Sequence, residues 1–273
     1  MTTSPEPVPG AAERFHQLHQ GPILVLPNAW DVASARLVED AGATAVATTS
    51  AALSWSWGAA DGEELGLETV LDLTRRIVDA VDLPVTTDFE AGYAQDLDAL
   101  AENVRAVLDA GAVGINFEDG FDGGLLPVAE QAARIAAIRQ EAGAGLYVNA
   151  RTDPYQRAVG APEGRLDETV RRAEAYLEAG ASGIFVPGVK DRGVIEQLVA
   201  RIPAPVNILV GPGSPTIPEL ADLGVARASA GSAIAQAVYG HVRRAATELL
   251  GPGTYTELAG AADYPTMNAL LSR

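Results

Sequence analysis

The amino-acid sequence predicts an α/β protein folded as a closed (β/α)8 barrel, a TIM barrel. Short apolar runs alternate with amphipathic helical segments along most of the 273 residues, and eight such pairs can be counted. A barrel of eight units takes about 250 residues, close to the length of this chain. The competing fold is a doubly wound open sheet, but no Gly-x-Gly-x-x-Gly motif follows the first predicted strand. We therefore expect the barrel.

Four of the predicted strands each follow a helix that ends on Ala-Gly or Leu-Gly. They lie within residues 38–49, 108–118, 177–187 and 220–230, and the first of these ranges reads VEDAGATAVATT. Glycine at this place readily adopts the left-handed conformation that ends a helix. The apolar run that follows has the composition of a parallel strand buried on both faces.

The other four predicted strands occupy residues 23–27, 83–88, 146–151 and 205–210. All eight belong to one predicted domain, 1–273, with a barrel core over about residues 21–250. A Gly/Pro break after Leu250 precedes a short helical pattern, so residues 251–273 are expected to form a C-terminal helical extension.

The composition excludes several classes of partner. Lys and Arg number 19 against 36 Asp and Glu, a net charge of −17 that repels nucleic acid. No apolar stretch approaches the ~20 residues of a membrane span, and the first residues lack the pattern of a secretory signal. We expect a cytoplasmic protein. The absence of cysteine excludes disulfides and thiol nucleophiles.

Acidic residues gather at the predicted carboxyl ends of the strands, where a barrel carries its chemistry. Asp88 and Glu90 end the third strand with alternating side chains, and Glu118 ends the fourth. Unpaired buried carboxylates are costly, so this group needs a cation. Oxygen donors alone suit a hard ion such as Mg²⁺, with Mn²⁺ as an alternative. Without a metal, Asp88 would cap the next helix and Glu118 would pair with Arg151.

Arg151, at the end of the fifth strand, has the fork geometry that binds a substrate carboxylate through two contacts. Alternatively, Arg151 forms a structural ion pair with Glu118, and the two roles are compatible. The three histidines, His16, His19 and His241, fall on helical segments away from the strand ends. We expect them at the surface.

With these motifs assembled, the chain resembles the isocitrate lyase/phosphoenolpyruvate mutase superfamily. The resemblance covers about residues 27–244 and rests on PNAWDVASARLVEDAGATAVATTSAA, TTDFEAGY, INFEDG and NARTD, in this order. It implies a (β/α)8 barrel, bound Mg²⁺ and a small anionic 2-oxo or 2-hydroxy acid as substrate. It also implies a homo-oligomer, a dimer or tetramer, in which the subunits exchange their last barrel helix.

The resemblance further implies roles for individual residues. Asp88 matches the direct Mg²⁺ ligand, Glu90 stands where the family has a second aspartate, and Glu118 matches a carboxylate that reaches the metal through water. Arg151 matches the arginine that holds the substrate carboxylate. Asp61, Glu118 and Arg151 are the expected catalytic residues, and Ser50, Ala51, Ala52, Arg151 and Asn207 are expected to bind substrate.

At two places the chain lacks the sequence motifs that characterise the family's named activities. The loop after the fourth strand reads GFDGGLLP and lacks both the Lys-x-Cys-Gly-His motif of the isocitrate and methylisocitrate lyases and the Lys-Thr-Asn motif of the phosphonate mutases. Residues 229–232, SAGS, stand where the family's oxaloacetate decarboxylases have a histidine.

We expect a Mg²⁺-dependent lyase that cleaves a carbon–carbon bond in a small 2-oxo or 2-hydroxy di- or tricarboxylate through a metal-stabilised enolate. The alternatives are a phosphonomutase or phosphonopyruvate hydrolase, and a non-catalytic barrel that binds a 2-oxo acid. The loop 120–127 is expected to close over the site. Asp61, Tyr93 and Asp122 are the candidate proton donors or bases.

Overall fold

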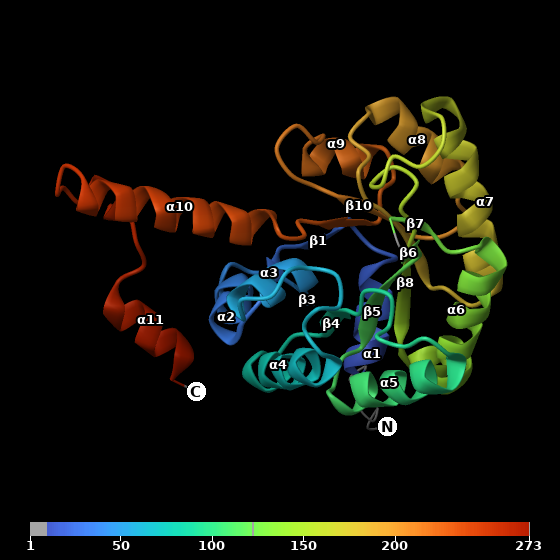
Figure 1. Ribbon diagram of the computed structural model, residues 1–273, viewed down its shortest axis with the longest axis horizontal. Helices are drawn as coiled ribbons and strands as arrows, with labels where there is room; N and C mark the ends of the chain where they lie inside the picture. The colour runs from blue at the N-terminus through green and yellow to red at the C-terminus, as the bar shows by residue number, and fades with distance from the viewer. Residues whose placement is uncertain (1–9, 122, 273) are drawn as a thin grey trace, which may run out of the picture.

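The chain forms a barrel of parallel strands surrounded by helices, in a computed structural model that describes residues 10–121 and 123–272 (Figure 1). The strand order is β1-β11-β10-β9-β8-β5-β4-β3-β2. Strands β1 (Leu24–Leu26) and β2 (Asn28–Ala29) are two parts of one extended segment, interrupted at Pro27, which has no N–H to donate. Because β1 pairs with β11 and β2 pairs with β3, this segment closes the ring. The predicted barrel and its eight strands are confirmed.

The outer helices cover the strands in turn. The other barrel strands are β3 (Val46–Thr48), β4 (Val85–Asp88), β5 (Gly114–Glu118), β8 (Tyr147–Arg151), β9 (Gly183–Val186), β10 (Val206–Leu209) and β11 (Arg227–Ser229). The outer helices are α2 (Val32–Asp40), α4 (Leu67–Ala80), α5 (Leu97–Asp109), α6 (Val128–Ala142), α7 (Arg165–Glu178), α8 (Arg192–Arg201) and α9 (Ile217–Asp222). Helix α3 (Ser50–Ser56) follows β3, and β6 (Gly120–Phe121) pairs with β7 (Gly124–Leu125) in a hairpin after β5.

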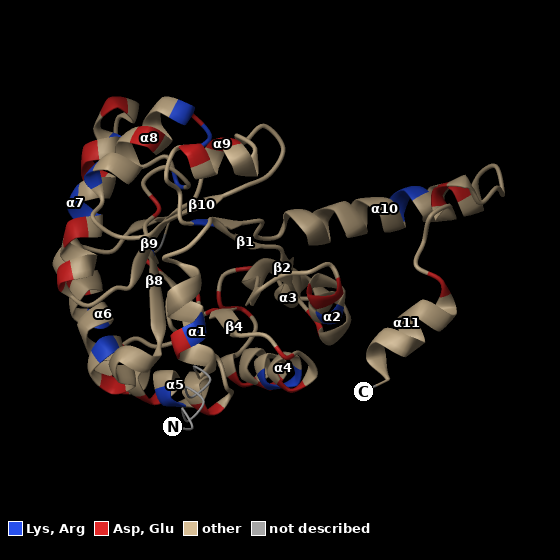
Figure 2. Ribbon diagram, turned by 180° about the vertical axis from the view of Figure 1, so that it is seen from behind, with Lys and Arg blue, Asp and Glu red and all other residues tan. Residues whose placement is uncertain are grey.

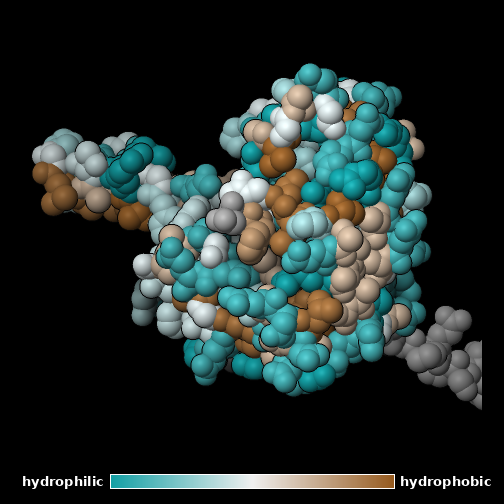
Figure 3. All heavy atoms as spheres, turned by 45° about the vertical axis from the view of Figure 1, so that its right-hand side comes forward, coloured by the Kyte–Doolittle hydropathy of each residue, from teal (hydrophilic) through white to brown (hydrophobic). Residues whose placement is uncertain are grey.

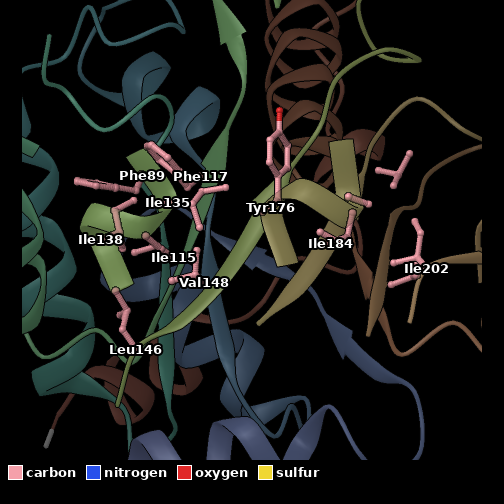
Figure 4. Close-up of a cluster of buried hydrophobic side chains, with 14 of the residues drawn as sticks. Phe89, Ile115, Phe117, Ile135, Ile138, Leu146, Val148, Tyr176, Ile184 and Ile202 are labelled. Atoms are coloured by element: carbon pink, nitrogen blue, oxygen red, sulfur yellow. The ribbon is translucent and has the colours of Figure 1, made fainter. Parts of the chain in front are cut away.

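Alternate residues of a strand face opposite sides, which separates an apolar outer layer from a polar barrel interior. On β5, Ile115 and Phe117 belong to the buried cluster between the strands and helices that Figure 4 shows. Asn116, between them, faces the interior. Its Oδ1 accepts hydrogen bonds from Asn149 Nδ2 at 2.8 Å and from Arg227 Nη2 at 3.2 Å. A polar layer therefore lies inside the barrel.

Helix α1 (Ala11–Leu18) packs against the amino-terminal end of the barrel. Phe15 is fully buried against Tyr147, the first residue of β8, with ring centroids 5.5 Å apart. His19 stacks on the same ring at 3.8 Å and is only 5% exposed. Burial lowers the pKa of His19 to about 3. The surface position expected for His19 is therefore wrong, because the apolar face of α1 brings it against the barrel. His16 is partly buried against the same ring, and His241 is partly exposed.

The chain after β11 forms an arm. Helix α10 (Ala233–Leu250) leaves the barrel, and α11 (Tyr264–Leu271) returns beside α2, where Arg36 Nε donates to Leu270 O at 3.0 Å (Figure 1). The last barrel strand is thus β11, and α10 and α11 follow it.

Two apolar surfaces are open as a result. Ile234, Val238 and Val242, four residues apart on α10, are exposed, and Figure 3 shows hydrophobic residues along one side of the arm. The first half of α10 carries no charged residue (Figure 2). On the barrel, Val25 of β1 is 37% exposed. A barrel strand normally buries such a side chain under a helix. No helix in the described ranges is long and apolar enough to cross a membrane.

Candidate active site

A cavity of about 320 Å³ opens at the carboxyl end of the barrel. Its wall combines residues that end or follow strands all round the ring. Its polar and charged members include Asn28, Ser50, Asp61, Asp88, Asn116, Arg151, Gln156, Lys190, Ser232 and Gln236. Polar groups that converge from separate strands into one cavity at this end of a barrel are typical of an active site.

Asp88, the last residue of β4, is held at the cavity wall by the segment around the end of β3. Its Oδ2 accepts hydrogen bonds from the Ser50 N–H at 3.0 Å and from Ser50 Oγ at 2.8 Å. Its own N–H donates to Thr48 Oγ1 at 2.9 Å. The alternative role for Asp88 as a helix cap is wrong, because Asp96 caps α5 by accepting from the Ala99 N–H at 2.8 Å.

Glu90 lies beyond the end of β4, and its carboxylate is not part of the cavity wall. Its backbone is left-handed, with φ 46°, so the strand alternation expected to align it with Asp88 does not reach it. Its Oε1 accepts from the Tyr93 hydroxyl at 2.5 Å and its Oε2 from the Glu63 N–H at 2.8 Å. Burial, helped by the charges of Asp88 and Asp61, raises the pKa of Glu90 to about 7 although the Tyr93 hydrogen bond opposes the shift.

Glu118, at the end of β5, pairs with two arginines. Its carboxylate lies 2.5 Å from Arg151 Nη1 and 3.6 Å from Arg157 Nη2, which confirms the predicted ion pair with Arg151. The Nε and Nη2 of Arg151 donate to the carboxylate of Asp153 at 2.7 and 2.8 Å. Burial raises the pKa of Glu118, and the adjacent charge of Arg151 acts in the opposite direction and favours the ionised carboxylate of the ion pair. Two acids therefore compensate the charge of Arg151.

The acids around Asp88 suit a hard divalent cation. Burial raises the pKa of Asp61, Glu90 and Glu118, and the charge of Asp88 raises each of them further. A cation beside Asp88 would stabilise the ionised forms of all four groups, and Mg²⁺ prefers carboxylate oxygens. Within residues 10–121 and 123–272, no three acidic or histidine side chains are already arranged as direct metal ligands. The donor set therefore fits an ion that keeps several of its water molecules.

The structure brings only some of the expected site residues to the cavity. Ser50, Ala51, Asp61, Asp88 and Arg151 line it, whereas Ala52, Glu90, Glu118 and Asn207 do not. Asn207 is buried in the barrel interior, where its Oδ1 accepts from Ser229 Oγ at 3.2 Å. Of the candidate proton donors, Asp61 is in the wall and Tyr93 is not. Asp122 lies outside the described residues.

The polar side chains of the wall that were not among the expected site residues include Gln156, Lys190 and Gln236. Lys190 follows β9 closely and is the only lysine in the chain. Because Lys190 is the only lysine and follows a predicted strand, the sequence alone could have identified it as a candidate site residue. Gln156 and Gln236 lie in a loop and on α10, where no sequence pattern points to the cavity.

Comparison with protein families matches residues 15–250 to the phosphoenolpyruvate phosphomutase family. An uncharacterized protein of Mycobacterium tuberculosis H37Rv is 41% identical over 219 residues, which cover 80% of this chain and 81% of that protein. A 2-methylisocitrate lyase of Bacillus subtilis is 36% identical over 208 residues, which cover 71% of this chain and 65% of the lyase.

Solved structures show the same fold. A protein of Burkholderia cenocepacia J2315 described as a candidate phosphonomutase is 42% identical, with a TM-score of 0.82, over 86% of this chain and 98% of that one. A phosphonopyruvate hydrolase in complex with oxalate and Mg²⁺ is 24% identical, with a TM-score of 0.85, over 96% of this chain and 95% of that one. At that identity the second similarity concerns the fold.

Proposed function

Because the chain belongs to the phosphoenolpyruvate phosphomutase family, within the isocitrate lyase/phosphoenolpyruvate mutase superfamily of enzymes, we propose that it is a Mg²⁺-dependent carbon–carbon lyase. The proposed substrate is a small 2-oxo or 2-hydroxy di- or tricarboxylate, and one product is a 2-oxo acid. The observation that carries the proposal is the presence of Asp88, Asp61 and Arg151 in the wall of one cavity at the carboxyl end of the barrel.

Asp88 would hold the cation directly, with Glu90 and Glu118 acting through water. When bound, Mg²⁺ supplies Lewis-acid stabilisation of negative charge that develops on the substrate's 2-oxo or 2-hydroxy oxygen. Ser50 fixes the orientation of Asp88 through two hydrogen bonds, so the ligand is positioned before the ion arrives. Glu90 is fixed in the same way by Tyr93 and by the Glu63 amide.

Arg151 would anchor the substrate carboxylate and Asp61 would move the proton. The acids Glu118 and Asp153 hold the Arg151 guanidinium in place at the cavity wall. Burial raises the pKa of the Asp61 carboxyl, which brings it closer to the working pH of a general acid or base. The loop 120–127 would exclude water from the site, and its Gly120 packs directly against Arg157.

The test is NMR of the purified protein with oxaloacetate, 2-methylisocitrate, 2,3-dimethylmalate and phosphonopyruvate, each with Mg²⁺ or with EDTA. We expect metal-dependent formation of a 2-oxo acid from one of the three carbon-only substrates. The Asp88→Ala variant corrects for the uncatalysed decay of oxaloacetate. Ligand-induced thermal stabilisation with no turnover of any substrate in a wider panel of 2-oxo and 2-hydroxy acids would favour a non-catalytic binding protein instead.

The second candidate is a phosphonomutase or phosphonopyruvate hydrolase. It is favoured by the 42% identity to the Burkholderia protein described as a candidate phosphonomutase. It is disfavoured by the sequence GFDGGLLP, which lacks the Lys-Thr-Asn motif after the fourth strand. Consumption of phosphonopyruvate alone in the NMR experiment would establish this second function and exclude the first.

We also propose that two or more copies exchange α10. The apolar side of α10 is open, and Val25 on β1 lacks the helix that normally covers a barrel strand, so we expect α10 of a second copy to cover it. Light scattering should show a dimer or tetramer for the wild type. Val242→Asp, at an apolar position 57% exposed, should give monomers, and Arg243→Asp on the same helix should not. A monomeric wild type would exclude the exchange.

A further inference from the structure

The only lysine of the chain lies in the cavity wall. The other 18 of the 19 basic residues are arginines, so Lys190 stands out in the sequence as well as in the structure. It lies four residues beyond Val186, the end of β9, and two residues before Arg192, the start of α8. Strand β9 is the immediate neighbour of β8, which carries Arg151, and lies three strands from β4, which carries Asp88.

The ammonium group of Lys190 is held by a neutral partner. Its Nζ donates to Pro212 O at 2.8 Å, in the loop 211–214 that follows β10. A Cβ atom on Gly213, which has φ +86°, would lie 3.9 Å from the same Nζ, so this loop passes close to the charge. A carbonyl positions an ammonium group but does not neutralise it.

The two cationic side chains of the cavity wall therefore differ in how freely they can bind an anionic ligand. Arg151 is compensated by the carboxylates of Glu118 and Asp153. The hydrogen-bond partner of Lys190 is a neutral carbonyl, which does not compensate the positive charge of the ammonium. The protein as a whole has a net charge of −17. The ammonium is attracted to an anionic group of the ligand more strongly than to a carbonyl, because the contact with an anion adds the attraction between two opposite charges.

We infer that Lys190 binds a second anionic group of the substrate, the one distal to the carboxylate and oxygen held near Asp88 and Arg151. The inference rests on the proposed function and names the residue that binds the second carboxylate of its di- or tricarboxylate substrate. Lys190 leaves the Pro212 carbonyl when the substrate enters. Gln156 and Gln236, from the same wall, supply amide groups for the remaining hydrogen bonds of this distal group.

The test compares two ligands that differ only in the distal group, malate and 2-hydroxybutyrate, by calorimetry in the presence of Mg²⁺. In the first ligand the group is a carboxylate and in the second it is a methyl. Lys190→Met should raise the Kd of malate about tenfold or more and leave the Kd of 2-hydroxybutyrate within about twofold. Lys190→Arg should restore most of the affinity for malate.

The matched control is Arg192→Met, which removes a positive charge two residues away. Arg192 is outside the cavity wall and contacts Glu219 at 3.7 Å. It should leave the Kd values of both ligands unchanged. An equal loss for the two ligands in Lys190→Met would overturn the inference, because the lysine would then act on the shape of the pocket. A wild type that binds malate no more tightly than 2-hydroxybutyrate would also overturn the inference, whereas the proposed function stands or falls with the turnover measured by NMR.

A second readout uses the uniqueness of the lysine. Reductive methylation with ¹³C-formaldehyde gives one dimethyl-lysine signal in an NMR spectrum, and the N-terminal α-amine serves as an internal control. Malate should shift the Lys190 signal, and 2-hydroxybutyrate should leave it in place. A signal that does not move while calorimetry shows malate binding would contradict the inference, as would an equal shift with both ligands.

Discussion

The two ends of strand β8 show how the barrel divides its tasks. At the first residue, the Tyr147 ring packs against Phe15 at 5.5 Å and stacks on His19 at 3.8 Å. At the last residue, Arg151 lies between the carboxylates of Glu118 and Asp153 in the wall of the cavity. At the first end, aromatic rings pack in close contact. The second collects charge, and its acids have raised pKa values.

The difference follows from burial. At the amino-terminal end, α1 excludes water, and burial together with the nearby charge of Arg227 keeps His19 neutral. At the carboxyl end, the acidic groups and Arg151 lie close together, as charged groups do in active sites. Repulsion between the acids costs stability, and the rest of the fold offsets this cost. Substitutions at the first end should therefore change stability and leave catalysis intact. Substitutions at the second end should do the opposite.

The largest effect is expected for Asp88→Ala. Losing the direct ligand should lower kcat/KM by about 10³-fold or more, since a bound metal ion contributes several kcal/mol to transition-state stabilisation. The melting temperature without Mg²⁺ should not fall, because one charge is removed from a repulsive group of acids. Turnover assays and thermal melts with and without Mg²⁺ measure both quantities. Retained turnover would refute the role of Asp88.

At the other end, Phe15→Ala should destabilise the protein by about 3 kcal/mol, at the low end for a buried phenylalanine because the terminal helix α1 can relax. Its KM should stay within about twofold of the wild type, since the site lies at the opposite end of the barrel. Chemical denaturation and steady-state kinetics provide the measurements. Phe121→Ala, at a residue 61% exposed on the hairpin, is the control and should cost less than about 0.5 kcal/mol.

The smallest effect is a pH dependence at His19. Its pKa is about 3 in the folded protein and 6.5 in the unfolded chain, so the unfolded state binds more protons between these values. The stabilisation is therefore complete above pH 6.5 and is lost as the pH falls towards 3. His19→Phe keeps an aromatic ring but cannot titrate. The stability of wild type relative to this variant should fall by about 2 kcal/mol between pH 7.5 and pH 5. A pH-independent difference would show that His19 does not titrate in this way.

Much of the barrel was predictable because its signals are local. Each helix that ends on a glycine before an apolar run was followed by a strand, and Asp88, Glu118 and Arg151 each end a strand as predicted. The positions of Glu90 and Ala52 relative to the cavity were not predictable, because they depend on how each short segment turns after the strand ends. A residue other than glycine that adopts the left-handed backbone conformation, such as Glu90, cannot be recognised from the sequence.

The sequence by itself determined the fold class, the family and the set of acids at the carboxyl end, since periodicity and motif spacing are properties of consecutive residues. Tertiary structure alone decided which of these groups share a cavity. Lys190, Arg151 and Asp88 are far apart in the sequence and line one cavity because β9, β8 and β4 lie within four consecutive strands of the barrel. It also decided that His19 is buried and that α10 leaves the barrel. Burial depends on what packs against a residue from elsewhere in the chain, and no local pattern encodes that partner.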